Sequence, residues 1–191
     1  MLIIEGTDML GKTTLCQELV KRINAKIGGS YTYEHFSKLP ECWDYWWDYL
    51  PHVRRRVVMD RFHMSEVAYR RARGEPEQLD SETYRLLDAK LRLVGAYTVV
   101  VIATERWLRT KIGSRPEMHT GEQILAANAE FTELATIGGV DADFVIEVDD
   151  DSQYPTNQSS DVDVIVNEYL NRQAHLNGLL RQRNETHGTL L

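Results

Sequence analysis

Short apolar runs alternate with longer amphipathic segments along the chain. The apolar runs are rich in β-branched residues, and they predict strands over residues 2–4, 31–36, 56–59, 97–103 and 144–148. The amphipathic segments carry apolar residues three and four positions apart, which predicts helices over residues 12–27, 43–50, 81–95, 121–136 and 161–182. A polar stretch over 149–160 predicts a loop. This alternation predicts an α/β fold, with a five-stranded, mostly parallel sheet and helices on both faces.

Composition narrows the class of protein. A length of 191 residues predicts a single domain over 1–191. With 22 Lys+Arg and 29 Asp+Glu the net charge is −7, which disfavours a protein that coats nucleic acid through bulk charge. No apolar run approaches the ~20 residues of a membrane helix, so no membrane partner is expected. Two cysteines, Cys16 and Cys42, make no disulfide framework. We expect a cytoplasmic protein.

A phosphate-binding motif follows the first strand. Residues 6–13 read GTDMLGKT and match G-x-x-x-x-G-K-[ST], with a strand before and a helix after. Glycines let backbone N–H groups point into a hollow, and the helix adds its positive dipole end. Lys12 is expected to reach the β- and γ-phosphates of ATP, and Thr13 to bind Mg²⁺. The predicted nucleotide-binding residues are Gly6, Thr7, Asp8, Gly11, Lys12, Thr13 and Thr14.

Three segments resemble the thymidylate kinases and the wider deoxynucleoside kinase-like P-loop kinases, phage-type nucleotide kinases included. Residues 5–14 (EGTDMLGKTT) resemble the opening of thymidylate kinases. Residues 60–65 (DRFHMS) resemble their D-R-[YF]-x-x-S motif, and 115–135 are similar to the lid and the helix after it. The similarity spans about residues 1–148. It implies a P-loop NTPase fold with a small lid at about 109–121.

The resemblance also implies roles for single residues. Asp8 would bond the sugar hydroxyl of the acceptor, and Asp60 would join Thr13 at Mg²⁺. Arg61 would hold the acceptor phosphate or the transferring phosphoryl group. The chain departs from the family at Met9, where a glycine is usual, and it has no arginine within the loop. The lid would then supply that charge, with Arg115 as the main candidate and Arg109 and Lys111 as weaker ones.

The acceptor pocket is the part that the sequence leaves open. Residues 31–56 match no usual thymidylate-kinase pattern, and Phe36 and Tyr69 are candidates for stacking on a base. Glu34 ends the second strand, where an acid in nucleoside kinases removes a proton from the sugar hydroxyl; His35 is an alternative base. The arginine run at 54–56 could meet a phosphate backbone, although a solvated face is the simpler interpretation.

Three functions follow from these residues. The leading hypothesis is ATP- and Mg²⁺-dependent phosphoryl transfer to a deoxynucleoside monophosphate. The second changes the acceptor to a hydroxyl, on a free deoxynucleoside or on 5-hydroxymethyluracil in phage DNA, and gives Glu34 the role of base. The third is a regulator that binds ATP without turnover. A homodimer is expected from the resemblance alone.

Overall fold

The sheet is entirely parallel among the residues that the structure describes. The structure is a computed structural model that describes residues 1–36, 49–77, 79–114, 119–136, 142–149 and 160–187. Its five strands are β1 (Leu2–Gly6), β2 (Thr32–His35), β3 (Val57–Asp60), β4 (Tyr97–Ala103) and β5 (Phe144–Val148). They form one sheet in the order β2-β3-β1-β4-β5. The five predicted strands are confirmed within two residues, and every paired neighbour is parallel.

Helices connect the strands and extend the chain beyond the last one. Their bounds are α1 (Lys12–Ile27), the short 3₁₀ helix η1 (Leu50–His52), α3 (His63–Arg73), α4 (Ser81–Leu93), α5 (Glu105–Lys111), α6 (Gly121–Thr136) and α7 (Ser160–His187). Helices α1, α4, α6 and α7 were predicted, whereas α3 and α5 were not. The predicted helix over 43–50 lies outside the described residues except for its last two positions.

The missed helix α3 had a usable signal. Met64, Val67 and Ala68 are buried and stand three and four positions apart, which is one helical face. Residues 60–65 were interpreted as a motif, and the spacing of Met64, Val67 and Ala68 was not used to predict a helix. Gly74 ends α3 in a left-handed conformation, and its N–H bonds to the carbonyls of Arg70 and Arg71.

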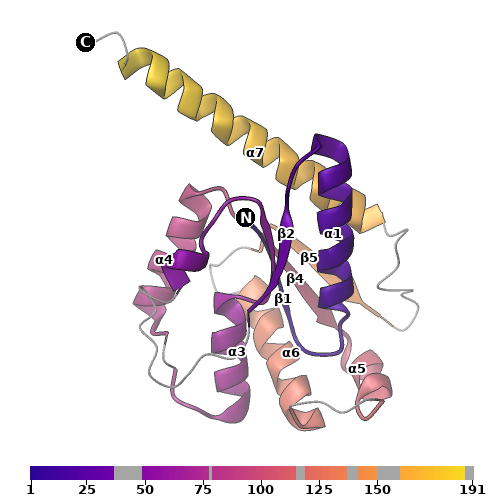
Figure 1. Ribbon diagram of the computed structural model, residues 1–191. Helices are drawn as coiled ribbons and strands as arrows, with labels where there is room; N and C mark the ends of the chain where they lie inside the picture. Colours follow the sequence, from indigo (N-terminus) through magenta and orange to yellow (C-terminus); the bar gives the residue numbers. More distant parts are fainter. Residues whose placement is uncertain (37–48, 78, 115–118, 137–141, 150–159, 188–191) are drawn as a thin grey trace.

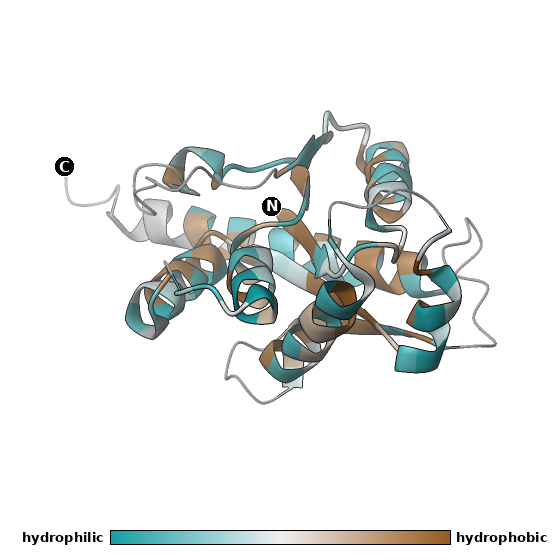
Figure 2. Ribbon diagram, turned by 90° about the horizontal axis from the view of Figure 1, so that it is seen from below, coloured by the Kyte–Doolittle hydropathy of each residue, from teal (hydrophilic) through white to brown (hydrophobic). Residues whose placement is uncertain are grey.

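Helices cover both faces of the sheet. Helices α1 and α7 pack on one face, and α3, α4 and α6 on the other (Figure 1). Along β1 the side chains alternate, so that Leu2 and Ile4 join the core under α1 and α7 while Ile3 joins the core under α3. Figure 2 shows the strands largely brown and the helices two-toned, as this layering requires.

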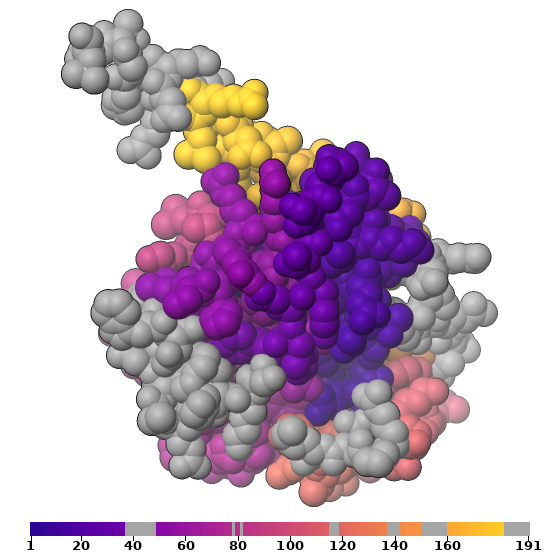
Figure 3. Space-filling view, in the orientation of Figure 1, coloured from indigo at the N-terminus to yellow at the C-terminus, as the bar shows by residue number. Residues whose placement is uncertain are grey.

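The same alternation of side chains along the strands decides which face of the sheet Glu5 and Asp60 occupy. Glu5 lies on the face of β1 that Ile3 occupies, and Asp60 on the face of β3 that Val58 occupies. Glu5 therefore points toward α3, and Asp60 toward α1. The carboxyl ends of the parallel strands meet at one edge, where a ligand site is expected. At the opposite end α7 projects beyond the body (Figures 1 and 3). Within the described residues no helix is long and apolar enough to cross a membrane.

Candidate active site

Residues 6–13, the phosphate loop, join β1 to α1. Three residues of this loop have positive φ. Gly6 has φ 137°, Met9 has φ 72° and Gly11 has φ 64°. A side chain at Gly6 would collide with the carbonyl oxygen of Val101 on β4, so the loop passes close to the neighbouring strand. Met9 adopts a left-handed conformation with a full side chain, at the position where the resembled family has glycine.

The side chain of Lys12 reaches back toward the start of the phosphate loop. Its Nζ donates a hydrogen bond to the carbonyl oxygen of Thr7 at 2.6 Å, and the residue is only 5% exposed. The hydroxyl of Thr7 in turn donates to the carbonyl of Ile124 on α6 at 3.2 Å. The lysine head is thus held above the loop, and the loop is tied to the helix beside it.

Thr13 and Asp60, the two residues predicted to bind Mg²⁺, lie within hydrogen-bond distance of each other. The Thr13 hydroxyl donates to Oδ2 of Asp60 at 2.7 Å, and the Tyr33 hydroxyl donates to the same oxygen at 3.2 Å. Nδ1 of His35 lies 3.3 Å from that oxygen. Burial, followed by the charge of Asp60, raises the pKa of Tyr33, so the phenol stays protonated and donates.

This pair offers oxygen ligands of the kind that Mg²⁺ prefers. Asp60 is 1% exposed, and its second oxygen, Oδ1, is buried with no hydrogen-bond partner among the described residues. An orphaned buried carboxylate oxygen beside a hydroxyl fits a cation or its bound water. The described residues hold no cluster of three or more His, Cys, Asp or Glu side chains for a metal. A magnesium ion that shares its shell with nucleotide phosphates does not need one.

Asp8, Arg61 and Tyr69 come together next to the loop. The Arg61 guanidinium forms an ion pair with Asp8 and lies 5.2 Å from the centre of the Tyr69 ring. His119 stacks on Tyr69, with the two ring centres 4.6 Å apart, and its Nε2 lies 4.0 Å from Oδ2 of Asp8. His119, to which no role was assigned from the sequence, stands just before α6, in the predicted lid.

Glu5 fixes the start of α3 relative to the loop. Its Oε1 accepts from the backbone N–H of Met64 at 3.0 Å, and its Oε2 accepts from the Ser65 hydroxyl at 2.5 Å. Burial raises the pKa of Glu5 to about 7, against the opposing effect of the hydrogen bond from Ser65. Glu5 therefore positions the segment that carries Arg61.

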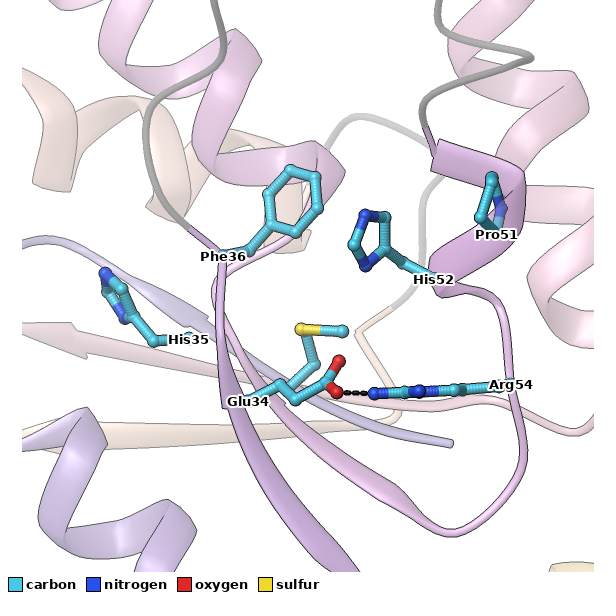
Figure 4. A pocket seen from close by; sticks show the side chains of 7 residues that line it. Glu34, His35, Phe36, Pro51, His52 and Arg54 are labelled. Carbon is cyan, nitrogen blue, oxygen red and sulfur yellow. Dashed lines mark ion pairs between the residues drawn. The ribbon is translucent and has the colours of Figure 1, made fainter.

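A second hollow of about 310 Å³ lies at the carboxyl end of β2. Figure 4 shows Glu34 and Phe36 pointing into it, with His52 and Pro51 opposite, while His35 points away on the other side of the strand. Glu34 forms an ion pair with Arg54, which reaches in from the turn before β3. Glu34 and Asp60 therefore face opposite sides of the sheet.

Phe36 is part of the core as well as of this hollow. It is 8% exposed, and its ring lies 5.1 Å from those of Tyr49 and His52 and 5.3 Å from that of Phe62. The predicted base-stacking residue is thus largely buried, although it lines the hollow. The His52 ring stands edge-on to it, at 85°.

The fold was compared with known proteins. No family model matches the chain, and no curated protein sequence matches it either. Among solved structures it is similar to the YorR protein of Bacillus subtilis, crystallised in complex with phosphorylated GDP. The TM-score is 0.64, the identity is 19%, and the alignment covers 97% of each chain. The chain has a P-loop NTPase-type fold.

Within the described residues, the predicted lid residues and Thr14 are not seen to join the group at the phosphate loop. Arg115 falls outside the described residues. The weaker lid candidates are engaged elsewhere: Arg109 pairs with Glu105 at 2.7 Å, and Nζ of Lys111 lies 5.2 Å from the Trp107 ring. Thr14 is exposed on the first turn of α1. Sequence reasoning missed Tyr33, whose place two residues before His35 on the same face of β2 could have revealed it.

Proposed function

We propose that this protein is an ATP- and Mg²⁺-dependent phosphotransferase whose acceptor is a deoxynucleoside monophosphate. The observation that carries the proposal is the hydrogen bond of Thr13 to Asp60 beside the phosphate loop. It joins the residue after the P-loop lysine to an acid at the end of another strand, the arrangement that holds Mg²⁺ in P-loop enzymes. The similarity to YorR, which was crystallised with a phosphorylated nucleotide, supports this assignment.

The donor half of the reaction would use the loop and the two oxygen ligands. ATP supplies the γ-phosphoryl group, and Mg²⁺ neutralises charge on it. The loop amides and the N-terminus of α1 would bind the phosphates. Lys12 would exchange the Thr7 carbonyl for phosphate oxygens, while Thr13 and Asp60 would hold the metal. Catalysis would then consist of positioning and electrostatic stabilisation, with no covalent intermediate on the protein.

The acceptor half would use the charged groups beside the loop. Arg61 would turn from Asp8 to a phosphate oxygen, which frees Asp8 to accept from a sugar hydroxyl. Arg54 would offer a second guanidinium at the 310 Å³ hollow, and Phe36 and Tyr69 would border the base. A phosphate acceptor is already anionic, so this route requires no general base.

Glu34 supports the second candidate, a hydroxyl acceptor. Its carboxylate lines the hollow at the end of β2, where it could take a proton from a nucleoside or from a hydroxymethylated base in DNA. Its ion pair with Arg54 weighs against that role, because the guanidinium occupies a carboxylate oxygen that would have to accept the proton. The monophosphate acceptor therefore remains the leading candidate.

Transfer of label from γ-labelled ATP tests the proposal directly. The acceptor panel contains deoxynucleosides, deoxynucleoside monophosphates, and DNA with and without hydroxymethylated bases. We expect label in a diphosphate, and a loss of at least about 10³-fold in Lys12→Ala because a charge on the transferring group is left unbalanced. Lys21→Ala, an exposed lysine on the same helix, is the matched control. ATP binding with no transfer to any acceptor would leave the regulator as the function.

The pair Glu34→Gln and Arg54→Gln separates the two acceptors. For a monophosphate, Arg54→Gln should raise KM for the acceptor about 10-fold, and Glu34→Gln should leave kcat within about threefold. A general base contributes about 10²–10⁴-fold, so for a hydroxyl acceptor Glu34→Gln should lower kcat by that factor. Steady-state kinetics on the acceptor found in the panel decide between the two patterns.

A further inference from the structure

A larger hollow lies at the opposite edge of the sheet. Its volume is about 560 Å³, and it lies between the end of α1, the turn before β3 and the middle of α7. The phosphate loop follows the carboxyl end of β1, whereas this turn precedes the amino end of β3. In a parallel sheet those are opposite ends, so this hollow is separate from the candidate active site. Figure 3 shows the indigo end of α1 and the purple segment beside yellow α7.

The hollow is positively charged. Arg55 and Arg56 line it, no Asp or Glu does, and the described residues give neither guanidinium an ion-pair partner. By contrast, the preceding arginine, Arg54, is paired with Glu34 at the other hollow. The sign of this local charge is opposite to that of the whole chain, whose net charge is −7. This concentration of positive charge favours a ligand with negative charge.

The backbone that carries these arginines is held in place. Arg56 has φ 64°, and its carbonyl accepts from the N–H of Thr32 at 3.1 Å. The neighbouring wall residue Tyr31 is clamped by Asn24, which accepts from its N–H at 2.7 Å and donates to its carbonyl at 3.1 Å. The arginine pair is therefore presented from a fixed turn, which lowers the ordering cost of binding.

The rest of the lining suits a nucleotide-like molecule. Asn171 and Asn177 contribute amide groups for which no protein hydrogen bond is found among the described residues, and Ile27 and Leu170 contribute apolar surface. Amides pair with the edges of heterocyclic bases, and apolar side chains pack on their faces. The volume falls within the range of small-molecule sites, which is about 300–1,000 Å³.

We propose that this hollow is a second binding site, for a nucleoside phosphate whose phosphate pairs with Arg55 and Arg56. Guanidinium groups match phosphate oxygens in two-point geometry. A nucleic-acid strand would need a longer basic track than these two arginines provide. The inference does not depend on the proposed phosphoryl transfer, since it uses none of the residues of the phosphate loop.

Isothermal titration of the Lys12→Ala protein with ADP, deoxythymidine monophosphate, inorganic phosphate and a single-stranded DNA oligonucleotide tests this site. The Lys12→Ala background weakens binding at the phosphate loop, and the Arg55 and Arg56 substitutions identify the binding that belongs to the second site. We expect a nucleotide to bind, and adding Arg55→Gln and Arg56→Gln to weaken that binding at least 10-fold. Arg181→Gln, an exposed arginine on α7 outside the hollow, is the matched control and should bind as before.

A second variant guards against a general effect of charge. Ala174→Trp would fill the hollow from α7 without removing a charge, and it should weaken the same binding at least 10-fold. Circular dichroism checks that each variant is folded. Nucleotide binding that is unchanged in both sets of variants, or binding of single-stranded DNA but of no mononucleotide, would overturn the proposal. Phosphoryl transfer is measured separately in the labelled-ATP assay. A protein that binds nucleotide at this hollow but transfers no phosphoryl group would therefore still support this proposal.

Discussion

At the scale of single residues, the candidate site contains backbone conformations that side chains rarely adopt. Among the described residues, Met9, Arg56 and Arg61 are the non-glycine residues with positive φ; Met9 lies in the phosphate loop and Arg61 beside it. Each costs about 1–3 kcal/mol, so the surroundings must hold it. Arg61 is held by its N–H bond to the carbonyl of Ile4 at 2.9 Å and by its ion pair with Asp8. Such strain is typical of functional sites.

The raised pKa of the buried Glu5 carboxyl should make the stability of the protein depend on pH. Its pKa rises from 4.5 to about 7 on folding, so the folded state binds more protons than the unfolded state between those values. The contribution of Glu5 to the free energy of unfolding is therefore complete below pH 4.5, and it is lost as the pH rises through 7. The full effect is on the order of 3 kcal/mol. Glu5→Gln should remove this loss between pH 5 and 8, measured by urea unfolding.

The control for that experiment is Glu133→Gln, an exposed carboxyl on α6. It should unfold with the same pH profile as the unmodified protein. Parallel profiles for Glu5→Gln and the unmodified protein would contradict the assigned pKa. Glutamine can still accept from the N–H of Met64, so the start of α3 should keep its place.

At the scale of elements, α6 supports both the sheet and the loop. Asn128 accepts from the N–H of Ala103 at 3.0 Å and donates to its carbonyl at 2.9 Å, which ties the helix to the end of β4. One turn earlier, Ile124 accepts from the Thr7 hydroxyl. Asn128 is 8% exposed, so these bonds are sheltered from water. The helix thus couples the end of β4 to the phosphate loop.

Asn128→Ala should therefore destabilise the protein by about 2 kcal/mol. The substitution leaves a buried N–H and a buried carbonyl of Ala103 without their side-chain partner. Urea unfolding measures the loss. Gln17→Ala removes an exposed amide from α1 and should change stability by less than about 0.5 kcal/mol. Equal stability of the two variants would show that the bonds to Ala103 contribute little.

The elements differ in how readily the sequence predicts them. The strand over 97–103 is buried at every position, so its uninterrupted apolar run was enough to predict β4. Helix α5 is only seven residues long, and its cap, where the Thr104 hydroxyl accepts from the N–H of Trp107 at 3.2 Å, is a local signal that periodicity does not detect. Long periodic segments were predictable, whereas short capped ones were not.

At the scale of the whole molecule, the sheet order decides which predicted residues meet. Because β1 lies between β3 and β4, the loop after β1 adjoins the end of β3, and Thr13 reaches Asp60. That meeting was predictable from a motif and a strand end. The pairing of Glu34 with Arg54 was not, because it depends on how the turn before β3 folds back over β2. Proximity across a turn leaves no periodic signal in the sequence.

The central place of β1 also has a consequence for how the chain acquires its structure during synthesis. Leu2–Gly6 pairs on one side with Val57–Asp60 and on the other with Tyr97–Ala103. A ribosome delivers these segments in that order, so the first strand emerges long before either neighbour exists. Its apolar side chains therefore lack one neighbouring strand until β4 has been synthesised, and until then they are exposed or bound by a chaperone. The sheet therefore closes late, around a strand that was translated before both of its neighbours.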